Sequence, residues 1–179
     1  TYEFFVKKLT RYHQGKQLIL KNPAHTARLT ILKKMFPNAK FIHIHRNPFE
    51  VDYSMEKFMS IVLPRYCVQR PPTSKQMKQY ILSMYEQLYK TYLKQKSMIN
   101  QNDLIEISYE SFITNPWNEI KKIYDYFNMS LSPESREKMK SYLDSQKNFK
   151  RSQYSMSESL KQEIAETWSF AFDSFCYSK

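Results

Sequence analysis

FIHIHRNPFEVDYS, from Phe41 to Ser54, is the part of the sequence that decides the fold. The run Phe41 to His45 predicts a short strand. The residues that follow predict a helix that begins at once: Asn47 can cap it, Pro48 suits its first position, and Glu50 can complete a capping box. A strand that leads through a capped turn into a helix is typical of an α/β protein.

Two further short apolar runs predict strands on either side of this stretch. Leu18 to Leu20 ends at Lys21, and Leu104 to Ser108 ends at Tyr109. The order of elements predicts an α/β fold, a parallel sheet flanked by helices, with the strand ends at Lys21, Arg46 and Tyr109 facing a common cleft. Helices are expected over residues 1–13, from Pro23, over Met77 to Met98, from Pro116, and over a last stripe of Leu160, Ile164, Trp168, Phe172 and Phe175.

Length and composition fit one globular domain. The chain has 179 residues, of which 41% are hydrophobic, and we expect residues 1–179 to form a single domain. Residues 60–76 predict a surface loop or lid. No stretch is long and apolar enough to cross a bilayer, and the sequence leaves the compartment open. Because an initiator Met is absent, we expect a processed product or a fragment.

Charge and glycine content narrow the possible partners. The formal net charge of +11 favours an anionic partner, whether nucleic acid, a membrane surface, an anionic cofactor or an acidic assembly. Gly15 is the only glycine, which excludes a glycine-rich phosphate loop within these residues. No nucleic-acid recognition motif is visible. His43 and His45 have no second pair of metal ligands beside them, so we expect no metal site.

Arg46 stands where an anion can bind, between the expected strand and the capped helix. A guanidinium can donate two hydrogen bonds to a phosphate, and the helix N-terminus adds a favourable potential. Ser54 lies eight residues later, and its hydroxyl can complete the site. Alone, an Arg-Asn-Pro sequence after a strand is more often a surface turn.

The surrounding sequence changes this balance. The run ILKNPAHTARLTILKKMFPNAKFIHIHRNPFEVDYS resembles the sulfotransferase family over its whole length. In that family an arginine and a serine eight positions later bind the 3′-phosphate of 3′-phosphoadenosine 5′-phosphosulfate (PAPS), which implies this role for Arg46 and Ser54. The resemblance also implies a P-loop NTPase-like sulfotransferase fold, PAPS and its product PAP as ligands, and sulfuryl transfer to a hydroxyl or amine acceptor bound by loops such as 60–76.

Two later blocks extend the resemblance. LIEISYESFITNPWNEIKKIYDYFNM resembles the family segment whose tyrosine contacts the adenine of the cofactor, which implies that role for Tyr109; a buried tyrosine that closes the sheet is the alternative. SQKNFKRSQYSMSESLKQEI resembles a basic segment that reaches the 3′-phosphate. Lys147, Lys150 and Arg151 are its candidates, and a solvated run of charge is the alternative.

The resemblance also suggests catalytic residues. Lys21 matches the strand-end lysine of the family, which would stabilise negative charge on the transferred group and the leaving phosphate. His25 is a candidate general base for the acceptor proton. Cytosolic relatives place their histidine two residues after the lysine, whereas His25 is four residues after Lys21, so a capping or packing role for His25 stays open.

One expected part of the family pattern is absent. The loop that binds the 5′-phosphosulfate carries a glycine with a Ser/Thr pair, and nothing in this chain fits it. The resemblance covers roughly residues 15–177, so we expect the N-terminal part of the fold to precede Thr1. A PAPS-dependent sulfotransferase is the leading hypothesis; a non-catalytic sulfotransferase-like subunit of a larger assembly is the alternative, and a nucleic-acid-binding domain is the least favoured.

Overall fold

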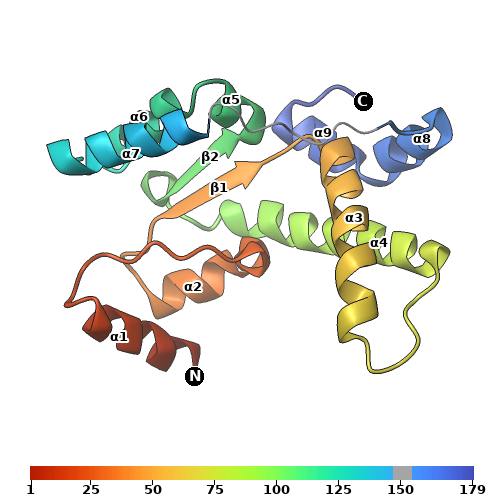
Figure 1. Ribbon diagram of the computed structural model, residues 1–179, viewed down its shortest axis with the longest axis horizontal. Helices are drawn as coiled ribbons and strands as arrows, with labels where there is room; N and C mark the ends of the chain where they lie inside the picture. The colour runs from red at the N-terminus through yellow and green to blue at the C-terminus, as the bar shows by residue number, and fades with distance from the viewer. Residues whose placement is uncertain (147–154) are drawn as a thin grey trace.

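The computed structural model describes residues 1–146 and 155–179. Two strands of this part of the chain, β1 (Phe41–His45) and β2 (Leu104–Ser108), pair in parallel, with Phe41 opposite Leu104 and His45 opposite Ser108. Helices surround them (Figure 1): α1 (Tyr2–Tyr12), α2 (Leu29–Met35), α3 (Pro48–Tyr66), α4 (Ser74–Lys96), α5 (Tyr109–Thr114), α6 (Pro116–Tyr126), α7 (Pro133–Ser145), α8 (Glu158–Thr167) and α9 (Ser169–Phe175), with short 3-10 helices η1 (Pro23–Arg28) and η2 (Gln101–Asp103). None of these described helices is long and apolar enough to cross a membrane.

Helices pack on both faces of the strand pair, as expected for an α/β protein. On one face, Ile105 and Ile107 of β2 are buried against Ile123 and Phe127 of α6 and its C-cap. On the other face, Phe41 and Leu104 pack against the core that α4, α8 and α9 build. Side chains that alternate along β2 therefore serve two separate cores, whereas Ile42 and Ile44 of β1 are exposed.

The larger core is aromatic. Ile81, Tyr92, Ile164, Trp168 and Phe172 of α4, α8 and α9 are fully buried. The Trp168 indole stacks on Tyr85 with ring centroids 4.0 Å apart and donates a hydrogen bond to the Leu82 carbonyl at 3.0 Å. The apolar stripes expected in the two helical regions are confirmed, although the backbone turns at Trp168 and divides the last helix into α8 and α9.

Helix α3 leaves β1 and crosses α4 (Figure 1). Asn47 caps it, because the Asn47 side chain accepts a hydrogen bond from the Phe49 N–H at 2.9 Å. Asp52, which is fully buried, forms an ion pair with Lys78 of α4. The helix continues to Tyr66, so the connection to α4 is residues 67–73 rather than the longer loop expected over 60–76.

Two expectations about elements need correction. Leu18 to Leu20 is not a strand in the described structure, because no strand lies beside it to accept its backbone hydrogen bonds, and Ile19 is 85% exposed. The adjoining Pro23 starts η1, a 3-10 helix, before α2 begins. Helix α7 was not expected, because its largely polar residues give little periodic signal.

Candidate functional site

The carboxyl ends of β1 and β2 bring two predicted site residues together. Arg46 directly follows β1, and Tyr109, the first residue of α5, directly follows β2. The Arg46 guanidinium carbon lies 4.6 Å from the centroid of the Tyr109 ring, which is the arrangement of a cation–π contact. The prediction that these two strand ends are parallel neighbours is confirmed.

The Arg46 guanidinium is paired with a carboxylate of the helix that follows it. The guanidinium pairs with the Glu50 carboxylate one turn later in α3, while the Arg46 side chain remains 32% exposed. Glu50 therefore pairs with Arg46, and α3 is capped by the Asn47 side chain rather than by the capping box expected from the sequence. A partly exposed cation at a helix N-terminus is a suitable place for an anion.

A hydrogen-bonded chain joins the two strand ends. One oxygen of Glu110 accepts the backbone N–H of Asn47 at 3.0 Å, and its other oxygen accepts the Tyr177 hydroxyl at 2.7 Å. The same hydroxyl lies 2.9 Å from Nδ1 of His45. We call Glu110, Tyr177, His45 and Asn47 the strand-end clasp. Sequence reasoning missed Glu110 and Tyr177, although the Tyr-Glu pair after β2 was a usable signal for Glu110.

The environment fixes the charge state of the clasp. Burial alone would raise the pKa of Glu110, but hydrogen bonds from the Asn47 N–H and the Tyr177 hydroxyl outweigh it and lower the pKa. Burial, with a contribution from His43, lowers the pKa of His45. Burial, together with the hydrogen bond to Glu110, raises the pKa of Tyr177. At neutral pH the clasp therefore holds an anionic Glu110, a neutral His45 and a protonated Tyr177.

The other predicted site residues do not join Arg46 in this way. Ser54 is exposed on α3, and Lys21 is exposed before η1. His25 in η1 lies 2.9 Å from the Tyr2 hydroxyl of α1, through its Nε2, and its ring packs edge-on against Tyr2. Burial and the nearby Arg28 charge lower the pKa of His25. Figure 1 shows α1 and α2 at the far side of the strand pair from α5 and α9.

Comparison with known families decides the affiliation of the chain. The model of the sulfotransferase family matches residues 1–133. The chain belongs to the sulfotransferase family. The match includes the Arg46 and Tyr109 segments and the whole of β1 and β2, and it makes the α/β sulfotransferase fold the established frame for the site.

Related sulfotransferases are known from mycobacteria. The omega-hydroxy-beta-dihydromenaquinone-9 sulfotransferases of Mycobacterium bovis and Mycobacterium tuberculosis are each 26% identical over 94% of this chain, which spans 43% of their length. Among solved structures, sulfotransferase STF9 from Mycobacterium avium has a TM-score of 0.74 at 16% identity, over 92% of this chain and 43% of that one. Sulfotransferase STF1 from Mycobacterium tuberculosis has a TM-score of 0.68 at 18% identity, over 90% and 41%.

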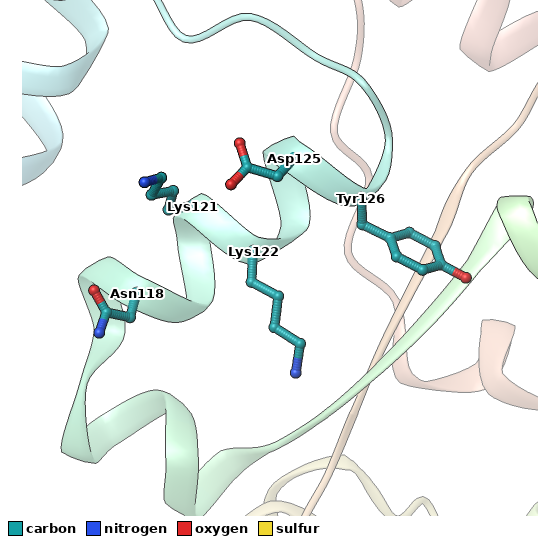
Figure 2. A pocket seen from close by; sticks show the side chains of 5 residues that line it. All are labelled: Asn118, Lys121, Lys122, Asp125 and Tyr126. Carbon is teal, nitrogen blue, oxygen red and sulfur yellow. The ribbon is translucent and has the colours of Figure 1, made fainter.

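Two surface hollows of the described part of this sulfotransferase chain lie on the α5–α6 side. Figure 2 shows the first hollow, which is lined by Asn118, Lys121, Lys122, Asp125 and Tyr126. All five residues belong to α6, so this hollow contains no group from the strand ends. A second, shallow hollow is lined by Glu110 and by residues of α5 and α6. The described residues contain no group of three or more side chains able to hold a metal ion. Lys147, Lys150 and Arg151 lie outside the described residues.

Proposed function

We propose that this chain supplies the nucleotide-binding part of a sulfotransferase that transfers a sulfuryl group from PAPS to a hydroxyl or amine acceptor. The observation that carries the proposal is the contact between Arg46 and Tyr109 at the carboxyl ends of two parallel strands. Ligands of α/β sheets bind at such ends. Arg46 supplies a cation for the 3′-phosphate, and Tyr109 beside it supplies an aromatic face for adenine.

The residues at this place fit a phosphorylated nucleotide. The Arg46 side chain is partly exposed and stands at the N-terminus of α3, where the helix dipole and the guanidinium both favour an anion. Ser54 is exposed on α3 and adds a hydroxyl to the proposed site. Glu50 competes with the phosphate for Arg46, so binding requires the guanidinium to share or exchange partners.

Sulfuryl transfer needs a few groups in defined places. The acceptor oxygen or nitrogen forms a bond to sulfur while the bond from sulfur to the bridging phosphate oxygen breaks, and PAP leaves. A base takes the acceptor proton, and a cation stabilises the charge on the leaving oxygen. Lys21 remains our proposed cation. His25 remains the proposed base, although its Nε2 contact with the Tyr2 hydroxyl must open before it can take a proton.

The names of the relatives suggest which class of molecule accepts the sulfuryl group. The curated mycobacterial relatives are named for an omega-hydroxylated dihydromenaquinone. We therefore propose an alcohol as the first acceptor to test for this chain, with phenols, sugars and amines as the comparison panel.

The test is sulfuryl transfer from PAPS by the native protein. We expect transfer to at least one acceptor of the panel, with Lys21→Ala reducing kcat more than PAP affinity, because PAP lacks the sulfuryl group that Lys21 faces. His25→Ala should lower the rate about 100-fold if it is the base. Lys138→Ala, an exposed lysine of α7, is the matched control.

The outcomes separate the hypotheses. A protein that binds PAP but transfers nothing to any acceptor supports a non-catalytic sulfotransferase-like subunit. A protein that neither binds PAP nor transfers the sulfuryl group contradicts the proposal. Full activity of His25→Ala together with an inactive Lys21→Ala would place the base elsewhere.

A further inference from the structure

Glu110 joins the two segments that the proposed nucleotide site depends on. Its neighbour Tyr109 stacks with Arg46, and its carboxylate accepts the N–H of Asn47, the neighbour of Arg46. Glu110 and Asn47 are 63 residues apart in sequence, so this bond fixes the spacing of the two strand ends beyond what the β1–β2 ladder sets. A change in that spacing would separate the cation from the aromatic ring.

The second oxygen of Glu110 determines which atom donates in each hydrogen bond between Glu110, Tyr177 and His45. An ionised carboxylate can only accept, so the Tyr177 hydroxyl must donate its single proton to Glu110. The Tyr177 oxygen is then left as an acceptor, and the His45 Nδ1 at 2.9 Å must be the donor. Neutral His45 is therefore held with its proton on Nδ1, which leaves Nε2 as the basic nitrogen.

We propose that Glu110 is a positioning residue of the nucleotide site, which holds the Arg46–Asn47 turn against Tyr109 and, through Tyr177, fixes the Nδ1-protonated tautomer of His45. The positioning of the nucleotide rests on the proposed function, whereas the tautomer of His45 does not. The lowered pKa of Glu110 agrees with a carboxylate that stays ionised while both of its oxygens accept hydrogen bonds.

Two substitutions of Glu110 separate geometry from charge. Glu110→Asp keeps the negative charge but is one methylene shorter, so it cannot span from Asn47 to Tyr177. Glu110→Gln keeps the shape but can accept only one of the two bonds. The glutamine oxygen stays with the Asn47 N–H, its amide then donates to Tyr177, and the Tyr177 hydroxyl turns to donate to His45. The clasp is thereby reversed, and the His45 proton moves to Nε2.

The first measurement is PAP binding by calorimetry, with the native protein and Glu110→Asp. We expect about fivefold weaker binding, which corresponds to the loss of one hydrogen bond. Glu134→Asp, an exposed carboxylate of α7, is the matched control and should bind PAP as the native protein does. Equal affinity of Glu110→Asp and the native protein would overturn the positioning role. Failure of the native protein itself to bind PAP would instead contradict the proposed function.

The second measurement is the nitrogen NMR spectrum of the His45 ring at mildly alkaline pH, without nucleotide. We expect the proton on Nδ1 in the native protein and on Nε2 in Glu110→Gln. Tyr142→Phe, which removes an exposed hydroxyl from α7, should leave the native tautomer in place. A proton on Nε2 of His45 in the native protein, or an unchanged tautomer in Glu110→Gln, would overturn the claim that Glu110 fixes the tautomer of His45. A merely structural role for Glu110 predicts no change of tautomer in a folded variant.

Discussion

Two polar clusters lie along the same pair of strands, and they differ in what their charges contact. The strand-end clasp follows the last residues of β1 and β2. One alternation earlier, His43 and Glu106 face each other across the ladder. We call the group that surrounds this earlier pair the mid-strand cluster, and it consists of His43, Glu106, Tyr92 and Lys96.

The mid-strand cluster combines two buried rings with two partly exposed charges, because the Glu106 and Lys96 side chains are 30% and 31% exposed. His43 is 8% exposed, and its ring lies 4.1 Å from that of Tyr92. Glu106 accepts hydrogen bonds from the Tyr92 hydroxyl and from the Lys96 ammonium, each at 2.8 Å. The protein's own donors thus occupy both oxygens of this carboxylate.

The strand end is arranged differently. Glu110 is also satisfied by internal donors, but Arg46 beside it keeps about a third of its side chain exposed and forms an ion pair with Glu50 of the helix that follows it. Similar residue types therefore form a closed set of hydrogen bonds in the middle of the strands and, at their ends, a cation whose partner Glu50 a bound anion can replace. Burial does not make this difference, because the Lys96 and Arg46 side chains are exposed to nearly the same extent, 31% and 32%.

The largest expected effect separates the two clusters by stability. Glu106→Ala should lower the free energy of unfolding by about 2 kcal/mol, because it leaves the Tyr92 hydroxyl without its acceptor and removes the partly exposed ion pair with Lys96. Glu110→Asp should cost less than about 1 kcal/mol. Denaturant unfolding measures both. Equal losses of stability would remove the distinction between the clusters.

Lowering the pH should reduce the stability that Glu106 of the mid-strand cluster provides. Burial alone would raise the pKa of Glu106, but the nearby His43 ring and hydrogen bonds from Lys96 and Tyr92 outweigh it and lower the pKa from 4.5 to about 2. A lowered folded-state pKa stabilises the protein above the unfolded value, and this stability is lost as the pH falls from about 4.5 towards about 2. Unfolding of the native protein should therefore become easier over this range, and the slope should decrease in Glu106→Gln. An identical slope in the variant would contradict this assignment.

A smaller effect is expected at the strand end. Glu50→Gln removes the carboxylate that competes with a phosphate for Arg46, so PAP should bind about threefold more tightly. Glu86→Gln, which alters the i,i+4 pair of Glu86 with the exposed Lys90 in α4, is the control. Weaker binding in Glu50→Gln would mean that Glu50 orients Arg46 for the ligand rather than competing with it.

The sequence was sufficient for the part of the fold that local pattern controls. The strand Phe41–His45, its capped helix and the strand Leu104–Ser108 are confirmed, because each has a strong local signal. The approach of Arg46 to Tyr109 followed from the geometry of parallel strand ends. Ser54, Lys21 and His25 keep their proposed roles as predictions.

Other features depend on contacts that no local pattern encodes. Tyr177 reaches Glu110 across 67 residues of sequence, and nothing near Tyr177 indicates that partner. Leu18 to Leu20 has the composition of a strand, but a strand also needs a neighbour to accept its backbone hydrogen bonds. Helix α7 begins with a Ser132 cap and Pro133, a start signal that its polar sequence made easy to overlook.

Binding of PAP to the native protein and to Arg46→Ala, measured by calorimetry, tests the central claim most directly. We predict that the native protein binds PAP and that Arg46→Ala weakens binding by about 2 kcal/mol, or about 30-fold, because a charge-assisted phosphate contact is lost. Ser54→Ala should cost about 1 kcal/mol, and Arg136→Ala on the exposed face of α7 should cost nothing measurable. An unchanged PAP affinity in Arg46→Ala would contradict the account.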